Sequence, residues 1–455
     1  MDAVVASGGT LRGSAVVPGD KSIAHRWLIL ASTASGRSRL VGLPPSLDVR
    51  STALCLAAVT EKPRPPLDLF ARNAASAVES GGSTWNAGSD TALIPTLEVE
   101  GRGRSALLAP TVPLDCGNSG TTMRLLSGLL AAAPFEATLT GDPSLSGRPM
   151  ERVAEPLRAM GAAIETTDGH APLVVRGGRL RGIRYAPTVP TAQAKSAVLL
   201  AGIAADGETT VAEPAPTRDH TERALAALGA PVETDEEGIH VRRYQHQGFD
   251  ALVPGDPSSA AFPLAAAAIT GSRISIEGVG LNPSRLHYLD VMERMGIHTT
   301  RSIDRTELGE PVGSITIEAC SEIRAVRVEP NELPLIIDEV PVLAALAAHA
   351  SSDSWFLEAS ELRVKESDRL LAITTGLRLL GGVAADEGVD LVIGGGGLEG
   401  GRADAHGDHR MAMALTVAAL GARTSSRIDG VDAADVSFPG FVASMRALGA
   451  LVEPA

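Results

Sequence analysis

Residues 158–166 read RAMGAAIET: an apolar helix end, then a glycine, then a run of small or β-branched residues. The pattern returns as AALGAPVET at 226–234, ERMGIHTT at 293–300, RLLGGVAAD at 378–386 and MRALGALVE at 445–453, with a weaker copy, VESGGSTW, at 78–85. Each central glycine fits the position after a helix, where a positive φ ends the helix and a strand follows. These glycines stand at 81, 161, 229, 296, 381 and 449, so the sequence predicts six helix-to-strand units of similar size.

A second repeat divides the six units into two groups of three. The tetrapeptide Val-Pro-Gly-Asp at 17–20 recurs at 253–256, each time before a helical stretch. This repeat predicts two domains, with the chain crossing between them near residues 19 and 253. The first unit is irregular. Extra Pro, Gly and Ser within 60–110, as in EKPRPPLDLF and ESGGSTWNAGSD, predict a surface insertion there.

Composition narrows the classes of function. The 455 residues carry 40 Lys+Arg against 54 Asp+Glu, a net charge of −14 that argues against nucleic-acid or membrane partners but allows a small anionic substrate in a locally basic site. Hydrophobic residues make up 44%, enough for folded cores, and three scattered cysteines form neither a disulfide framework nor a zinc site. No apolar run approaches the ~20 residues of a membrane span, and the start, MDAVVASGGT, lacks a signal-peptide pattern, so we expect a cytoplasmic protein.

Several polar segments precede predicted helices. Lys21 and Arg26 fall in the first turn of a helix that begins near Asp20, where cations oppose the helix macrodipole. This placement favours anion binding, although two solvent-exposed charges would give the same pattern. A polar loop at 117–122, GNSGTT, also runs into a helix, and such loops let backbone N–H groups approach phosphate or carboxylate oxygens. Repeated helix starts of this kind suggest one shared site for a polyanion.

Two segments carry carboxylates suited to proton transfer. The segment at 363–369, RVKESDR, has five charges in seven residues before an apolar helix. In LIIDEV at 335–340, Asp338 stands in an apolar setting, where a carboxylate either finds a partner or has its pKa raised by desolvation. The alternative is that Asp338 only caps the helix that follows.

Five motifs together resemble one family. They are PGDKSIAHR at 18–26, CGNSGTTMR at 116–124, GDPSLSGRPM at 141–150, ELRVKESDR at 361–369 and GDHRMAM at 407–413. In this order they are similar to the 5-enolpyruvylshikimate-3-phosphate synthases, enolpyruvyl transferases also called 3-phosphoshikimate 1-carboxyvinyltransferases. The resemblance implies an α/β (α+β) fold: a two-domain inside-out α/β barrel, with three helix–strand repeats per domain, helices inside and sheets outside. It also implies that 1–19 joins 254–455 in a phosphoenolpyruvate-side domain, and that 20–253, with an insertion at about 60–110, forms the shikimate-3-phosphate-side domain.

The implied reaction transfers the enolpyruvyl group of phosphoenolpyruvate to the 5-hydroxyl of shikimate 3-phosphate and releases phosphate by addition and elimination. It belongs to chorismate and aromatic amino acid biosynthesis. We expect a monomer with small-molecule substrates, no cofactor and no metal. The resemblance implies catalytic roles for Lys21, Asp338 and Glu366; shikimate 3-phosphate binding by Lys21, Ser22, Arg26, Thr191, Ala192, Gln193, Thr217, Arg218, Asp338 and Lys365; and phosphoenolpyruvate binding by Lys21, Gly120, Arg148, Gln193, Arg369 and Arg410.

The sequence departs from the family pattern at a few positions. Val436 stands where many relatives carry a lysine that contacts phosphoenolpyruvate, Glu361 replaces an asparagine of the same relatives, and Ala24 replaces a usual serine. Val436 and Glu361 are similar to a subgroup that includes glyphosate-tolerant enzymes. Gly120, however, keeps the small residue where tolerant members often carry alanine, so sensitivity to glyphosate stays open.

Three other interpretations are weaker. The related UDP-N-acetylglucosamine enolpyruvyl transferases usually carry a cysteine where Pro143 stands, and Lys-Asn where this chain has Lys21-Ser22. A non-catalytic paralogue would not need the intact Lys21, Asp338 and Glu366. A metal enzyme could use the histidines and aspartate of HGDH at 406–409, but the sequence shows no third ligand nearby.

Overall fold

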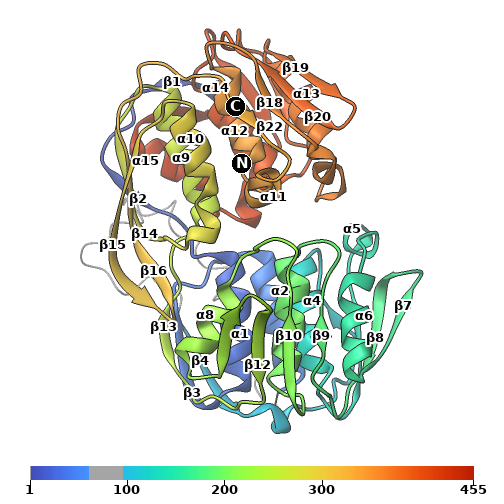
Figure 1. Cartoon of the computed structure of the whole chain (residues 1–455). Helices are drawn as coiled ribbons and strands as arrows, with labels where there is room; N and C mark the ends of the chain where they lie inside the picture. Colours follow the sequence, from blue (N-terminus) through green and yellow to red (C-terminus); the bar gives the residue numbers. More distant parts are fainter. Residues whose placement is uncertain (1, 61–95) are drawn as a thin grey trace.

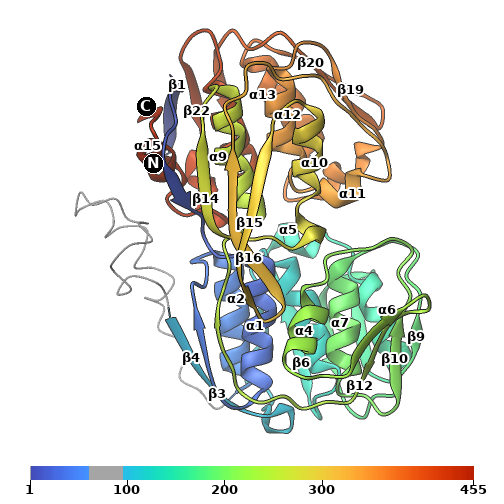
Figure 2. The same ribbon diagram turned by 60° about the vertical axis from the view of Figure 1, so that its left-hand side comes forward.

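The computed structural model describes residues 2–60 and 96–455 and shows two halves joined where the chain crosses between them (Figure 1). Both termini lie in the upper half of that view, and the chain between the two crossings forms the lower half. The described residues form six sheets, one for each predicted unit. The sheets lie on the outside of each half and the helices lie between them (Figures 1 and 2), which confirms the predicted inside-out α/β architecture.

The lower half contains three of the sheets. The first is β13-β3-β4, from Asp250–Leu252, Ser35–Val41 and Thr96–Arg102. The second is β5-β6-β8-β7, from Leu114–Asp115, Glu136–Thr140, His170–Arg176 and Ala163–Thr167. The third is β11-β12-β10-β9, from Val232–Asp235, Gly238–Arg242, Glu208–Val211 and Arg184–Tyr185. The described helices of the lower half are α1 (Lys21–Thr33), α2 (Leu47–Ala58), η2 (Arg104–Ala106), α4 (Gly120–Leu130), α5 (Pro143–Ser146), α6 (Glu151–Met160), α7 (Ala192–Gly202) and α8 (His220–Ala227).

The upper half contains the other three sheets. The first is β21-β22-β1-β23, from Arg402–Asp404, Ser426–Asp429, Ala3–Gly9 and Ala450–Pro454. The second is β15-β16-β14-β2, from Thr299–Glu307, Glu310–Ile317, Ile274–Gly280 and Ser14–Val16. The third is β17-β18-β20-β19, from Arg327–Val328, Ser354–Phe356, Asp390–Gly394 and Val383–Glu387. Its helices are α9 (Pro257–Ile269), η3 (Pro283–Arg285), α10 (His287–Arg294), α11 (Leu333–Ile336), α12 (Val340–Ala348), η4 (Ala359–Val364), α13 (Arg369–Leu379), α14 (His409–Ala419), η5 (Val431–Val436) and α15 (Phe441–Leu448).

The repeated glycines end helices as the sequence predicts. Gly161, Gly229, Gly296, Gly381 and Gly449 all have positive φ, at 114°, 84°, 82°, 78° and 105°. A residue with a side chain is strained in this region, and glycine is not, so the helix can stop and the strand can begin within two or three residues. The sixth glycine of the series, at position 81, lies outside the described residues.

The innermost helices of the upper half are mostly apolar and are buried on nearly every side. All residues of α12 and α14 are buried, and so is α9 from Pro257 to Ala268. A helix that is hydrophobic all round is stable only when it is surrounded, here by other helices and by the inner faces of the sheets. This explains why alanine and leucine, with few aromatic residues, can fill the centre of each half.

Two separate hydrophobic cores follow the two halves. One contains buried residues between Ile23 and Val253, and the other combines Val4–Val17 with residues from Ala260 to Val452. The N-terminal strands β1 and β2 pair with β22, β23 and β14 of the second core. The division of the chain at residues 19 and 253 stays a prediction, which these cores support.

The predicted insertion at about 60–110 is described only in part. Residues 61–95 lie outside the described residues. Within the remainder, β4 pairs with β3 along seven consecutive residues, from Thr96 opposite Val41 to Arg102 opposite Ser35. This part of the segment therefore belongs to the sheet itself.

Candidate active site

Lys21 begins α1 at the boundary between the halves. Asp20 caps this helix, because its Oδ1 accepts a hydrogen bond of 2.9 Å from the backbone N–H of Ile23. The Nζ of Lys21 lies 2.9 Å from Oδ2 of Asp48. Burial alone would lower the pKa of Lys21, but the carboxylates of Asp48 and Glu366 outweigh it and raise the pKa. Lys21 is therefore held as a cation between groups of both halves.

Arg26 lies one turn further along α1 and is almost fully buried. Its Nε donates to Thr221 Oγ1 at 2.9 Å, its Nη1 to the backbone oxygen of Ser22 at 2.7 Å and its Nη2 to Ser196 Oγ at 2.8 Å. Burial lowers the pKa of Arg26 to about 10, so the side chain stays protonated at neutral pH. The structure thus joins α1, α7 and α8 through one guanidinium group.

The starts of α4 and α7 are held together by polar contacts. Gln193 Nε2 donates to Thr121 Oγ1 at 2.8 Å, and Gln193 Oε1 accepts from Arg124. Gly120 opens α4 beside these groups, and a Cβ at this position would lie 3.1 Å from Arg124 Nη1 and 3.6 Å from Arg148 Nη1. Two arginines therefore surround the N-terminus of α4, whose free backbone N–H groups also attract anions.

Arg148 is oriented by the polar loop before α4. Its Nη2 donates to Asn118 Oδ1 at 2.6 Å, and Asn118 Nδ2 in turn donates to Asp142 Oδ2 at 2.7 Å. Because the carboxylate of Asp142 holds the amide, Asn118 presents its oxygen to the arginine. Arg148 thus has a fixed direction and keeps its charge available.

Asp338 lies in the turn between α11 and α12 and joins the two halves. Its Oδ2 is 2.6 Å from Nη2 of Arg218 in the lower half and 3.8 Å from Nη2 of Arg410, whose Nη1 donates to the Asp338 backbone oxygen at 2.7 Å. Desolvation would raise the pKa of Asp338, but Arg410 and Arg218 outweigh it and hold the pKa well below its usual range. Of the two outcomes that the sequence allowed, this carboxylate has found partners.

The capping interpretation of Asp338 is wrong. The N-cap of α12 is Glu339, and its side chain makes no capping hydrogen bond to this helix. The geometry leaves the Asp338 carboxylate facing arginines from both halves.

Glu366 and Arg369 form a second charged group in the upper half. Arg369 Nη2 lies 2.7 Å from Glu366 Oε2, and its Nε donates to Asp408 Oδ2 at 2.8 Å. Arg369 is 1% exposed, whereas Glu366 is 32% exposed at the boundary. Desolvation would raise the pKa of Glu366, but Arg369, His409, Lys21 and Arg148 together hold it well below its usual range.

The remaining predicted residues are less tightly connected to this group. Thr191 is the N-cap of α7 without a side-chain capping bond, and Ala192 is the first residue of that helix. Thr217 Oγ1 donates to Glu213. Lys365 Nζ lies 3.9 Å from Glu361, and desolvation lowers its pKa despite the attraction of Asp338.

Comparison with known proteins agrees with this geometry. A family model described as EPSP synthase (3-phosphoshikimate 1-carboxyvinyltransferase) matches residues 5–64 and 91–445. The chain belongs to the EPSP synthase family. Among EPSP synthase relatives, the 3-phosphoshikimate 1-carboxyvinyltransferase of Acidithiobacillus ferrooxidans is 44% identical over 456 residues, covering 99% of each chain, and that of Thermus thermophilus is 46% identical over 441 residues, covering 95% of each. The structure of EPSP synthase from Acinetobacter baumannii has a TM-score of 0.83 at 36% identity and covers 100% of this chain and 99% of that chain.

The sequence alone did not single out several residues that contact the predicted site residues. Asp408 and Arg124 stand inside the quoted motifs GDHRMAM and CGNSGTTMR, so their position gave a signal. Asp48 gave none, because it stands in the first turn of a helix outside the quoted motifs and its importance comes from its contact with Lys21. The same holds for Thr221, which reaches Arg26 from α8.

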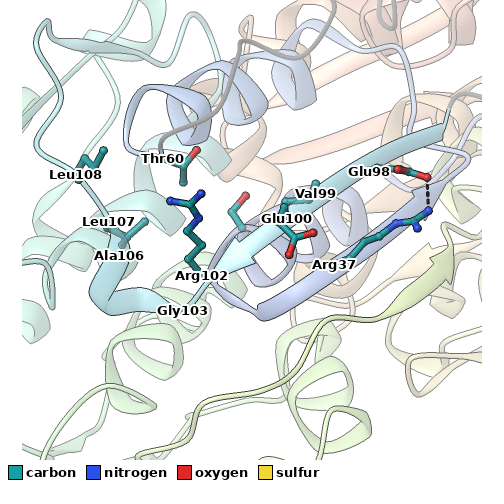
Figure 3. Close-up of a pocket in the computed structure, with 11 residues that line it drawn as sticks. Arg37, Thr60, Glu98, Val99, Glu100, Arg102, Gly103, Ala106, Leu107 and Leu108 are labelled. Carbon is teal, nitrogen blue, oxygen red and sulfur yellow. Dashed lines mark hydrogen bonds and ion pairs between the residues drawn. The ribbon is translucent and has the colours of Figure 1, made fainter.

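A hollow lies elsewhere in the lower half of this EPSP synthase fold. It measures about 480 Å³ and lies beside β4 (Figure 3). Arg37 and Glu98 form an ion pair at its edge, and no predicted site residue lines it.

Over residues 2–60 and 96–455, no group of three or more His, Cys, Asp or Glu side chains is arranged to hold a metal ion. No helix in the described part of the chain is long and apolar enough to cross a membrane.

Proposed function

We propose that the charged residues at the boundary between the halves carry out the reaction of the EPSP synthase family. The chain is a 3-phosphoshikimate 1-carboxyvinyltransferase of the shikimate pathway: it transfers the enolpyruvyl group of phosphoenolpyruvate to the 5-hydroxyl of shikimate 3-phosphate. The observation that carries the site assignment is the contact of Asp338 with Arg218 across the boundary, because it brings a base and the cations of both halves to one place.

The lower half supplies the shikimate 3-phosphate side of the proposed site. Ser22, Arg26, Thr191, Ala192, Gln193, Thr217 and Arg218 come from the starts of α1 and α7 and from the loop before α8. Lys365 joins them from the upper half. A dianionic phosphate requires cations and hydroxyl or N–H donors, and this set supplies both kinds.

The phosphoenolpyruvate side combines both halves. Gly120, Arg148 and Gln193 come from the lower half, Arg369 and Arg410 come from the upper half, and Lys21 lies between the substrates. Arginine suits this role because its planar donors bind a carboxylate or phosphate in a bidentate manner. Arg410→Ala is therefore expected to weaken phosphoenolpyruvate binding more than shikimate 3-phosphate binding, and equal losses in titration calorimetry would contradict the assignment.

Asp338 and Glu366 are the proposed proton-transfer groups. Addition joins the 5-oxygen of shikimate 3-phosphate to C2 of phosphoenolpyruvate, while the 5-hydroxyl loses a proton and C3 gains one. Elimination then removes a proton from C3 and breaks the bond from C2 to phosphate. Asp338 is ionised and lies on the shikimate 3-phosphate side, so it can accept the hydroxyl proton. Glu366, beside Arg369, is placed to exchange the proton with C3.

Bound substrates would change the proton affinity of these carboxylates. The cations that lower the pKa of Glu366 include Arg369, Lys21 and Arg148, which are also the proposed phosphoenolpyruvate ligands. When the phosphate and carboxylate of phosphoenolpyruvate share these cations, the pKa of Glu366 rises towards the working pH. Glu366 thus becomes able to carry a proton only when its substrate is present.

The test is phosphate release from phosphoenolpyruvate with shikimate 3-phosphate, run in parallel with UDP-N-acetylglucosamine as acceptor. Release only with shikimate 3-phosphate is expected. Asp338→Asn and Glu366→Gln should each lower kcat by about 10²–10⁴-fold, the range of general acid–base catalysis. Glu399→Gln is the matched control, because this carboxylate pairs only with the exposed Arg423 and should leave kcat unchanged. Parent-like kcat in Asp338→Asn would refute its assignment as the base.

We further propose that the protein is a cytoplasmic monomer. Its acidic balance supports a protein that stays separate from nucleic acid and anionic membranes. Each half has its own buried core, so neither half needs a second copy to bury its helices. Light scattering on the purified protein tests the monomer, and a dimer at micromolar concentration would contradict it.

A further inference from the structure

Arg285 is a buried arginine that no motif of the sequence singled out. It is the last residue of η3, and its side chain is 2% exposed. Its Nη1 contacts Asp20 Oδ2, and its Nη2 lies 2.8 Å from Asp256 Oδ1 and donates to Ser258 Oγ at 2.9 Å. Because a buried guanidinium keeps its charge and has five donors in a rigid plane, it can fix several acceptors relative to one another.

The two aspartates are equivalent positions of the Val-Pro-Gly-Asp repeat. The backbone N–H of Asp20 donates to the Pro254 oxygen at 2.7 Å, and the backbone N–H of Asp256 donates to the Pro18 oxygen at 2.8 Å. The two crossings of the chain therefore lie against each other in an antiparallel arrangement. Arg285 joins the last residue of each crossing through its side chain.

From Arg285, short connections lead to three segments of the proposed active site. Asp20 precedes Lys21 and caps α1. Ser258 Oγ, which accepts from Arg285, donates to Glu339, the residue after Asp338.

The third connection reaches the loop of Arg218. His220 Nε2 lies 3.3 Å from Arg285 Nη1, and His220 Nδ1 lies 2.8 Å from Glu310 Oε1. A neutral His220 that carries its proton on Nδ1 satisfies both contacts, since it donates to Glu310 and accepts from Arg285. The groups connected to Arg285 therefore stand close in the chain to the proposed site residues. Asp20 is next to Lys21, and His220 is two residues after Arg218. Glu339, reached through Ser258, is next to Asp338.

We propose that Arg285 is a positioning residue, which keeps Lys21, Arg218 and Asp338 in register across the two chain crossings. It touches none of the proposed substrate positions and acts through Asp20, His220 and Ser258. This inference rests on the proposed function, because the register matters only if these three residues act on the same pair of substrates. A purely structural ion pair would stabilise the crossings but leave turnover by folded protein unchanged.

Arg285→Lys tests the proposal. Lysine keeps the charge, but its single ammonium group cannot hold Asp20, Asp256, Ser258 and His220 in one plane. A shift of about 1 Å in catalytic groups can cost about 10²-fold, so we expect kcat to fall by about 10- to 100-fold. KM should rise by a smaller factor than kcat falls, because Lys21 and Arg218 also bind substrate in the proposed site, whereas Arg26, Arg148 and Arg369 are held by other partners. Parent-like kcat in the folded variant would overturn the proposal.

Arg104→Lys is the control, because it replaces a half-buried arginine that also makes long-range hydrogen bonds but lies away from the proposed site. Arg104 Nη1 donates to the backbone oxygens of Ile203 and Tyr244 at 2.9 and 2.8 Å. Ile203 follows the last residue of α7, whereas Gln193 lies near its start, so about 15 Å of helix separates Arg104 from the site. Arg104→Lys should weaken folding but leave kcat unchanged, and a matching fall in kcat would mean that general loosening explains the Arg285 result.

Two further measurements complete the design. Asp20→Asn combined with Arg285→Lys should lose no more kcat than the more damaging single variant, because both break the same connection; multiplied losses would overturn the proposal.

If Arg285→Lys does not fold, Ser258→Ala replaces it, since it breaks only the connection to Glu339 and removes no charge. It should lower kcat with KM nearly constant, and an unchanged kcat would overturn the proposal. The parent protein, assayed alongside, separates the two questions: an inactive parent refutes the proposed function, whereas an active parent with equally active variants refutes only the role of Arg285.

Discussion

Helices α4 and α7 of the lower half approach each other closely at Gly128, and Gly128→Ala tests whether this contact sets the geometry of the site. Gly128 lies inside α4, and a Cβ there would meet the backbone of α7, at 2.3 Å from the Ala197 oxygen and 2.7 Å from the Ala197 Cα. No side chain can turn away to make room. Since α4 begins at Gly120 and α7 presents Gln193, the substitution should change the spacing of both site segments.

The cost follows from this distance. Carbon approaches a carbonyl oxygen to about 3.3 Å, so α4 and α7 must separate by about 1 Å. Gaps of about 0.5–1 Å forfeit a quarter to a half of the attraction between packed atoms, and overpacking of a core costs about 1–3 kcal/mol. Alanine offsets about 1 kcal/mol through its higher helix propensity. A backbone clash belongs at the upper end of the overpacking range, so we expect a net loss of about 2 kcal/mol in unfolding free energy.

Equilibrium urea unfolding followed by circular dichroism measures this loss, and Gly376→Ala is the control. Gly376 also lies inside an eleven-residue helix, α13, but its Cβ would meet only the end of the Leu415 side chain, at 2.7 Å from Cδ2. That side chain can change rotamer, so the helix-propensity gain should nearly balance the strain. If Gly128→Ala is as stable as the parent, or no less stable than Gly376→Ala, the reasoning from backbone contact is refuted.

Three further predictions concern pH and substrate affinity. Burial holds the pKa of His25 at about 3, below the 6.5 of a free imidazole, so its contribution to stability is complete above pH 6.5 and is lost as the pH falls towards 3. His25→Asn should therefore reduce the slope of unfolding free energy against pH in this window by about 1.4 kcal/mol per unit, measured by urea titrations at several pH values; an unchanged slope would contradict it. Arg218→Gln removes a cation 2.6 Å from Asp338, so the pKa of Asp338 should rise and the acidic limb of kcat/KM should move to higher pH. A limb that stays in place would show that Asp338 does not set it. Gly120→Ala places a Cβ 3.1 Å from Arg124 Nη1. This should raise KM for phosphoenolpyruvate about fivefold to tenfold, which corresponds to about 1 kcal/mol, and leave KM for shikimate 3-phosphate unchanged. Equal changes in both KM values would mean a general distortion.

The architecture was predictable because its signals are local. A glycine at a helix end needs a positive φ whatever surrounds it, and the five described copies, from Gly161 to Gly449, all adopt one. The repeat of Val-Pro-Gly-Asp predicts both crossings for the same reason, since a similar short sequence takes a similar local path, and the two hydrophobic cores support this prediction. Six sheets in two halves follow from these two observations, together with the resemblance of the five motifs.

The partners of the charged residues could not be predicted in the same way. Asp338 could have had a raised or a lowered pKa, and the direction was decided by Arg410 and Arg218, which are 72 and 120 residues away in the chain. Asp48 and Arg285 carry no local signature, because each matters through a contact with a residue from a distant segment. Long-range pairing depends on how the two halves meet, and no periodicity or spacing within one segment encodes it.

The two copies of the crossing show how one scaffold gives an asymmetric site. Asp20 and Asp256 both cap their helices, through the backbone N–H of Ile23 and of Ser258, and share Arg285, but different residues follow them. Pro257 begins a helix that is buried almost to its end, so this copy serves the core. Lys21 follows the other copy, and the carboxylates of Asp48 and Glu366 keep it charged at the boundary despite its burial. The repeat therefore predicts where the chain crosses, whereas the single residue after each aspartate decides which crossing supplies the cation. Both crossings contact one guanidinium, so Arg285 links the structural copy to the segment that carries Lys21.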